Sequence, residues 1–136
     1  MKYFLDTNII IYAAKGMFPV LIDRFTEHRP EEIFIPAIVS SEIEYGARKS
    51  IDYVTMMSKY RNFLSLFSVV SFSEKAAYCS GIIRSDLEKK GTPIGVYDTL
   101  IAGTVIANDG VLVTHNVNEF RRVEGLRVED WTQDQK

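Results

Sequence analysis

Short apolar runs alternate along the chain with longer segments whose apolar residues recur every three or four positions. Each short run is bounded by polar or turn-forming residues, which is typical of strands that are buried on both faces. These runs predict five strands, at 3–5, 33–35, 68–72, 111–114 and 126–128. The fourth strand is followed by the polar pair His115-Asn116, and the last strand is short. The longer segments predict helices at 8–15, 20–27, 37–47, 51–66, 74–90 and 96–108.

Strands that are separated by helices throughout indicate a parallel sheet, because parallel neighbours need a crossover connection. We therefore predict an α/β fold, a three-layer α/β/α sandwich around a mostly parallel sheet of four to five strands. Right-handed crossovers would place the exits of all these strands along one edge. Segment 96–108 is apolar nearly all round and should be the most central helix, whereas 51–66 has more apolar surface than one core-facing stripe requires.

Composition narrows the class of protein. The 136 residues fit one domain, which we assign to 1–131, followed by a polar tail at 132–136. A net charge of −2 excludes a bulk basic protein that coats nucleic acid, although it leaves a local basic patch open. Cys79, the single cysteine, cannot form an internal disulfide and is predicted to be a small core residue. No membrane-spanning or signal segment is recognisable, so the cytoplasm is the expected compartment.

Four polar residues occupy related positions in this pattern. Asp6 and Asn116 follow predicted strands, while Glu42 and Asp98 lie near the starts of helices. All four positions belong to the same edge of a parallel sheet, where α/β proteins bind ligands. Taken singly, Asp6 could be a helix cap, Asp98 a charge at a helix start and Glu42 an exposed residue. Taken together, carboxylates gathered there would repel one another unless a cation joined them, and oxygen ligands without His or Cys favour Mg²⁺ or Mn²⁺.

The chain resembles the PIN-domain nucleases, and among them the VapC-type toxins of bacterial toxin–antitoxin pairs. The resemblance covers nearly the whole chain and rests on the order and spacing of four motifs. These are Phe4-Leu5-Asp6-Thr7-Asn8, Ser41-Glu42-Ile43-Glu44-Tyr45-Gly46, the segment from Gly91 to Ala102 that contains Tyr97-Asp98-Thr99, and Val113-Thr114-His115-Asn116-Val117-Asn118-Glu119-Phe120.

The resemblance implies that Asp6, Glu42 and Asp98 are catalytic and bind Mg²⁺, for which Mn²⁺ could substitute. Many family members have an Asp where this chain has Asn116, which offers an oxygen without a charge. Glu119, three residues later, is then a further candidate for the same role, so we keep both. Thr7, Asn8 and Thr114 are candidates for orienting the carboxylates or a water molecule.

The implied activity is that of an endoribonuclease, the toxin of a type II toxin–antitoxin pair, in which metal-activated water hydrolyses structured RNA such as tRNA or rRNA. The implied partners are the RNA, a VapB-type antitoxin and a second copy of the chain in a homodimer. The apolar segment 51–66 could form a groove wall for the antitoxin. Candidate phosphate contacts are Arg48, Lys49, Arg84, Lys89, Lys90, Arg121 and Arg122.

Two other functions compete with the nuclease. A strand that ends in Asp is also found in phosphatases of the haloacid dehalogenase type, but these expect a second Asp at position 8, where this chain has Asn8. A catalytically weak PIN domain that binds RNA or a partner without cutting is the second alternative. Asn116 favours it, whereas the three retained carboxylates argue against it.

Overall fold

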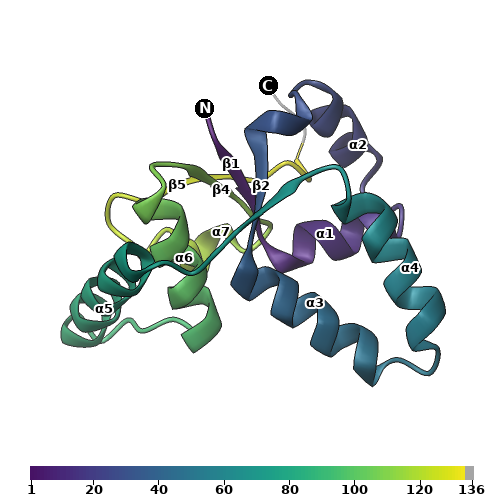
Figure 1. Ribbon diagram of the computed structural model, residues 1–136. Helices are drawn as coiled ribbons and strands as arrows, with labels where there is room; N and C mark the ends of the chain where they lie inside the picture. The colour runs from purple at the N-terminus through teal and green to yellow at the C-terminus, as the bar shows by residue number, and fades with distance from the viewer. Residues whose placement is uncertain (134–136) are drawn as a thin grey trace.

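The computed structural model describes residues 1–133 and contains a five-stranded, fully parallel sheet (Figure 1). The strands lie in the order β3-β2-β1-β4-β5, with β1 at the centre. Their bounds are β1 Tyr3–Leu5, β2 Ile33–Pro36, β3 Ser68–Val70, β4 Val111–Val113 and β5 Arg127–Glu129. Because every pair is parallel, the carboxyl ends of all five strands face the same edge.

Helices cover both faces of the sheet, as predicted. The chain moves from β1 to β2 to β3 and then returns past β1 to β4, so right-handed crossovers place the earlier and later helices on opposite faces. In Figure 1, α1, α3 and α4 lie on one side, and α5 and α6 lie on the other. The bounds are α1 Thr7–Ala14, α2 Pro19–Thr26, α3 Ala37–Lys49, α4 Tyr53–Leu64, α5 Glu74–Lys89, α6 Val96–Ala107 and α7 Val117–Phe120.

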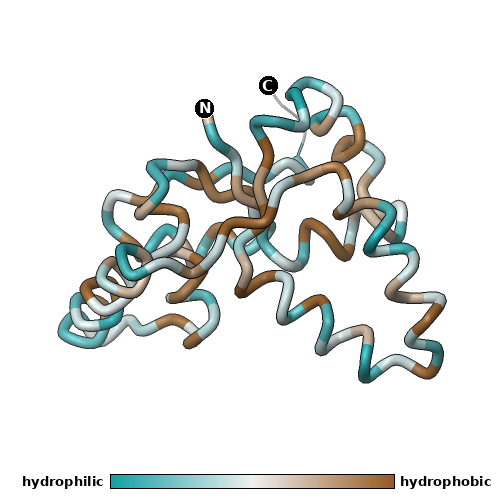
Figure 2. Tube along the Cα trace, in the orientation of Figure 1, coloured by the Kyte–Doolittle hydropathy of each residue, from teal (hydrophilic) through white to brown (hydrophobic). Residues whose placement is uncertain are grey.

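The core lies where the strands meet the helices that flank them. Phe4, Leu5, Leu112 and Val113 on the two central strands are fully buried, and Figure 2 shows hydrophobic colour concentrated along the strands at the centre. Helix α6 is buried at Thr99 and from Ile101 to Val105, as expected of a central helix, whereas Val96 and Tyr97 at its start are exposed. The hydrophobic pattern identified the central strands because residues on both of their faces are buried, whereas the edge strands β3 and β5 are partly exposed.

Helices α5 and α6 pack closely through small residues. A Cβ on Gly103 of α6 would overlap the Ser80 hydroxyl and crowd the Ala76 carbonyl, both on α5. The Ser80 hydroxyl donates to that same carbonyl at 2.7 Å, so it leaves no buried polar atom unsatisfied. This contact fixes α6, and with it the residues at its start, against the outer helix.

Several sequence predictions need correction. Cys79 lies on α5 as expected, but it is only half-buried and lines a surface cavity. The predicted helix 51–66 is shorter, because Ile51 and Leu66 lie outside α4 and are exposed. A 3₁₀ turn at Pro30–Glu32 was not predicted. Of the predicted polar tail, Thr132 is buried, while residues 134–136 lie outside the described part of the chain.

No helix among the described residues is long and apolar enough to cross a membrane.

Candidate active site

Asp6 lies at the carboxyl end of the central strand and is only 4% exposed. Its backbone N–H continues the sheet by donating to the Val113 carbonyl, and its side chain caps α1 by accepting from the Thr7 N–H at 2.8 Å. The other carboxylate oxygen accepts from the Thr114 hydroxyl at 2.7 Å. The structure confirms the helix cap, and it also places the Asp6 carboxylate at the edge of the sheet where the site was predicted.

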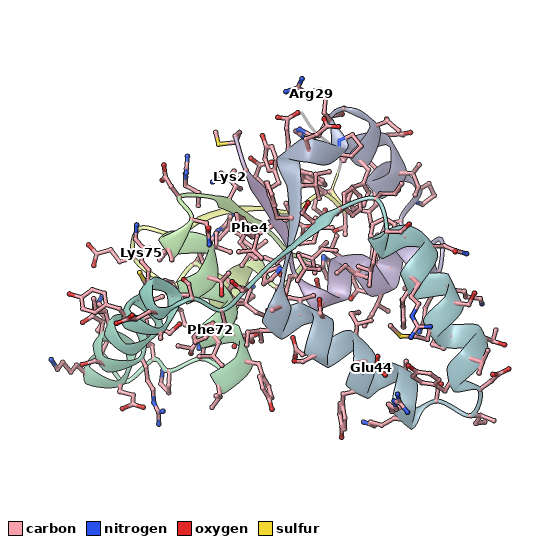
Figure 3. All side chains as sticks on the ribbon, viewed as in Figure 1. Lys2, Phe4, Arg29, Glu44, Phe72 and Lys75 are labelled. Carbon is pink, nitrogen blue, oxygen red and sulfur yellow. The ribbon has the colours of Figure 1, made fainter. Side chains whose placement is uncertain are left out.

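Glu42 approaches Asp6 from the second turn of α3. Its carboxylate accepts a hydrogen bond from the Thr7 hydroxyl at 2.6 Å, so Thr7 joins the two acidic residues through its backbone and its side chain. Glu44, two residues later, points elsewhere: its carboxylate pairs with Arg48 at 2.8 Å and accepts from the Tyr53 hydroxyl. Figure 3 shows Glu44 toward the far end of α3, away from the sheet. The two glutamates diverge because residues two apart on a helix do not share a face.

Asp98 lies in the first turn of α6 and shares a hydrogen bond with Glu119 from α7. Glu119 is held from two further sides. The Asn116 side-chain amide donates to one of its oxygens at 2.6 Å, and the Gly95 backbone N–H donates to the other at 3.1 Å. Asn116 thus contributes a donor that orients Glu119, and the charge at this position comes from Glu119.

The acidic cluster formed by Asp6, Glu42, Asp98 and Glu119 raises the pKa of two of its members. Burial raises the pKa of Asp6 to about 6, and the charges of Glu42 and Glu119 add to this, against hydrogen bonds from Thr114 and Thr7. Burial also raises the pKa of Asp98 to about 7, together with its hydrogen bond to Glu119 and the charge of Asp6. The cluster therefore concentrates more negative charge than its surroundings compensate.

Glu119 differs from the two aspartates. Burial raises its pKa, but hydrogen bonds from Gly95 and Asn116 outweigh burial and hold the pKa below its ordinary value. The nearby Arg122 guanidinium lowers it further. In the hydrogen bond between the two carboxyl groups, Asp98 consequently keeps the proton and Glu119 is the anion.

The acidic cluster matches a hard divalent cation by its chemistry, because its donors are all oxygens and carry an excess of negative charge. No three His, Cys, Asp or Glu side chains among residues 1–133 already close around a common metal position. Hydroxyl and amide donors occupy several of the carboxylate oxygens instead. Oxygens held in this way suit an ion that keeps several of its own waters, as Mg²⁺ does.

The seven predicted phosphate contacts do not form one surface patch. Arg48 pairs with Glu44, Arg84 pairs with Glu88, and Lys49 lies over the Tyr45 ring. Arg122 lies near the acidic cluster, since its guanidinium donates to the Pro93 carbonyl at 3.0 Å and its charge acts on Glu119. Lys89, Lys90 and Arg121 are exposed on the surface, and Lys90 is 3.8 Å from Glu124.

Sequence analysis named Asn8, Asn116 and Glu119 as candidates but did not identify the Gly95 N–H, which donates to Glu119. The Gly95 N–H has no sequence signal, because a backbone donor is identified only by the side chain that reaches it. Asn8 accepts from the His115 N–H at 3.4 Å, which joins the turn after β1 to the turn after β4. The spacing of Asn116 and Glu119, three residues apart, was a usable signal, because residues so spaced lie on one face of a helix.

Comparison with known proteins identifies the family to which the chain belongs. The PIN domain family model matches residues 3–126. The tRNA(fMet)-specific endonuclease VapC of Salmonella typhimurium is 37% identical over 131 residues, covering 96% of this chain and 98% of the relative. Ribonuclease VapC2 of Rickettsia felis is 38% identical over 136 residues, covering 96% and 98%.

A solved structure agrees with this assignment. The crystal structure of VapBC2 from Rickettsia felis, bound to a DNA fragment from their promoter, contains a chain that matches this one with a TM-score of 0.91. The match has 37% sequence identity and covers 96% of this chain and 99% of that chain. The predicted fold and family are confirmed, and the chain belongs to the PIN-domain family and, within it, to the VapC ribonucleases.

Proposed function

We propose that this protein is a divalent-metal-dependent endoribonuclease and the toxin of a VapBC toxin–antitoxin pair in the cytoplasm. Asp6, Glu42, Asp98 and Glu119 would hold Mg²⁺, or Mn²⁺ in its place, at the carboxyl edge of the sheet. The observation that carries the proposal is the convergence of these four carboxyl groups from four separate segments of the chain. Burial, with the neighbouring carboxylates adding to it, raises the pKa of Asp6 and Asp98, so this arrangement is unfavourable for stability alone.

The contacts of each residue in and around the acidic cluster suggest its role in catalysis. Bound Mg²⁺ would supply an activated water for attack on a phosphodiester and charge stabilisation for the departing oxygen. Asp6, buried and fixed by Thr7 and Thr114, is the most rigid anchor of the site. Glu119, kept anionic by Gly95 and Asn116, provides charge beside Asp98. We assign Asn116 to the orientation of Glu119, and Thr7, Asn8 and Thr114 to the support of Asp6.

The substrate and partners follow the relatives' printed functions. The Salmonella relative is named as specific for tRNA(fMet), so that tRNA is the first RNA to test here. The Rickettsia complex contains both VapB and VapC, which supports a VapB-type antitoxin as partner. Its binding groove would run along α4, which packs on α1 and α3, and the toxin itself would act as a homodimer. Arg122, beside the acidic cluster, is the best placed of the predicted phosphate contacts.

Two glutamates on α3 provide a matched test of the catalytic site. Glu42→Gln removes one carboxylate from the cluster, whereas Glu44→Gln removes one carboxylate from the surface of the same helix. We expect Glu42→Gln and Asp6→Asn to lower the rate of tRNA cleavage by at least about 100-fold, the range of a removed electrostatic catalyst. Glu44→Gln should cleave at the wild-type rate. Gel analysis of end-labelled tRNA with Mg²⁺ and with EDTA measures each rate.

Each outcome of that assay decides between functions. Cleavage that persists in EDTA, or that survives Asp6→Asn, would contradict a metal site built on Asp6. RNA that is bound but left intact by every protein would support a binding module in place of a nuclease. Hydrolysis of para-nitrophenyl phosphate without RNA cleavage would support the phosphatase. The product ends should carry a 3′-hydroxyl and a 5′-phosphate.

A further inference from the structure

Three aromatic rings from separate elements meet at His115, whose chain neighbours Thr114 and Asn116 bond to the acidic cluster. Tyr12 lies on α1, Phe18 directly precedes α2, and His115 follows β4. The ring centroids of Tyr12 and Phe18 are 5.1 Å apart, those of Phe18 and His115 are 5.5 Å apart, and those of Tyr12 and His115 are 5.8 Å apart. These separations are typical of aromatic contact, so the three rings, here called the aromatic platform, form one packed unit.

His115 is the exposed and oriented member of the aromatic platform. Its side chain is 38% exposed. Its ring Nδ1 lies 3.2 Å from an Asp130 carboxylate oxygen and 2.9 Å from the Thr132 hydroxyl, which fix the plane of the ring. Its backbone N–H donates to Asn8, so the main chain beneath the ring is held as well. The ring is therefore both open to solvent and restrained.

Phe18 carries an unusual backbone conformation. Its φ is +55°, in the left-handed region that a bulky L-residue rarely adopts. A conformation of this kind persists only where the surrounding structure enforces it, and such positions concentrate at ligand-binding sites. Here it places the Phe18 ring against both Tyr12 and His115.

The aromatic platform is directly connected to the acidic cluster. Thr114, which precedes His115, donates to Asp6, and Asn116, which follows it, donates to Glu119. The Asn116 N–H also donates to the Thr114 hydroxyl at 3.0 Å, so the chain is tightly folded on both sides of His115. His115 is therefore held between two residues that both bond to the acidic cluster.

We propose that Tyr12, Phe18 and His115 form a platform on which an unpaired RNA base next to the cleaved phosphodiester stacks. The proposal rests on the ribonuclease function above and names a further contact with its substrate. Aromatic and histidine rings are the side chains on which proteins stack splayed bases of single-stranded RNA. The Tyr12 hydroxyl and the His115 Nε2 atom add polar atoms that a base edge can bond, which favours a nucleobase over an apolar peptide side chain.

Fluorescent base analogues test the platform directly. The probes are RNA hairpins with one 2-aminopurine at successive positions of an unpaired loop, mixed with the protein in EDTA. We expect the wild-type protein to quench one loop position through stacking. Phe18→Leu and His115→Leu should remove that quenching and raise KM about tenfold in Mg²⁺, the order of a single base–aromatic stack. The kcat should change much less, because the acidic cluster is intact.

Aromatic replacements separate stacking from folding. Phe18→Trp and His115→Phe keep a ring at each position and should restore both quenching and KM. Tyr78→Leu is the control, because Tyr78 is 71% exposed on α5, outside the platform. Its quenching and KM should match those of the wild type. Thermal melts identify any variant that has lost its fold, and the ring-retaining pair decides the question in that case.

Three results would overturn the platform: quenching that survives both leucine variants, a KM that they leave unchanged, or leucine variants that lose only the binding of a VapB-type peptide. The last would make the rings a peptide-docking site. If the wild-type protein cleaves no RNA but quenches a loop base through these rings, the platform stands and the proposed nuclease fails. The two proposals are thus tested by separate readouts.

Discussion

At the scale of single residues, Asp6 combines two roles that are usually distributed over two side chains. One carboxylate oxygen caps α1 through the Thr7 N–H, and the other accepts from the Thr114 hydroxyl. These bonds lower the cost of holding a carboxylate that is 4% exposed. They do not remove it, because burial still raises the Asp6 pKa to about 6.

Protonation of Asp98 gives a prediction for pH. Its pKa rises from 3.8 to about 7 on folding, so the metal-free folded protein binds a proton that the unfolded chain releases. This contribution to stability is present at low pH and is lost as the pH rises from about 4 to about 7. Asp98→Asn removes the titration and keeps a donor for Glu119. In EDTA, the Tm of the variant relative to wild type should therefore increase over this pH range.

The control for this titration is Asp86→Asn, which changes net charge equally at an exposed position on α5. Its Tm difference from wild type should follow no such rise between pH 4 and pH 7. A flat difference for Asp98→Asn would show that burial and the neighbouring carboxylates do not act on this group.

Thr114 gives a prediction for stability. It is fully buried, donates to Asp6 and accepts from the Asn116 N–H. Thr114→Val keeps the shape and leaves two polar groups without partners, so we expect a loss of about 1–3 kcal/mol in the free energy of unfolding. Thr104→Val is the matched control, since its hydroxyl donates only to a carbonyl of its own helix, that of Leu100. That variant should change stability by less than about 1 kcal/mol in urea unfolding.

At the scale of elements, the site depends on how the start of α6 meets the short helix α7. Gly95 caps α6 and directs its N–H to Glu119, while Asp98 in the first turn of α6 shares a hydrogen bond with the same carboxylate. The position of α6 is fixed in turn by its close packing on α5 at Gly103. An outer helix with no catalytic group thus contributes to the geometry of the acidic cluster.

Alanine substitutions at two glycines test the packing of α5 against α6. Gly103→Ala would place a methyl group against Ser80 and the Ala76 carbonyl, so we expect a loss of about 1–3 kcal/mol from overpacking. Gly81→Ala, on α5, meets nothing within 4 Å and should gain about 0.5–1 kcal/mol from helix propensity. Chemical unfolding of both variants measures the difference. Equal stabilities would contradict a tight contact between α5 and α6.

At the scale of the whole molecule, an ion bound by the acidic cluster would join four segments that are far apart in the chain, and should therefore raise the Tm. A ligand at 100 times its Kd adds about 2.7 kcal/mol to stability, which corresponds to a Tm increase on the order of 5–10 °C for a domain of this size. We expect saturating Mg²⁺ to raise the wild-type Tm by this amount at pH 7. Glu42→Gln should reduce the increase, and Glu44→Gln should retain it. An equal increase in both variants would place the ion elsewhere.

The sequence by itself determined the elements and the edge on which the site is built. Buried strands such as 3–5 and 111–113 must be continuously apolar, and the first polar residue after each strand marks its exit from the sheet. Asp6, Glu42 and Asp98 were found in this way, because strand ends and helix starts share one edge of a parallel sheet. The matched motifs then identified the family, as the relatives confirm.

Only the tertiary structure decided which oxygen atoms meet. Sequence analysis left open whether Asn116 or Glu119 completes the site, because a four-residue helix can be entered at many angles. The fold turns the Asn116 amide toward Glu119 and brings the Gly95 N–H to the same carboxylate. The aromatic platform arises likewise, since Tyr12, Phe18 and His115 are far apart in the chain and meet through loop geometry. Such contacts depend on long-range packing, which the local pattern of hydrophobic and polar residues does not encode.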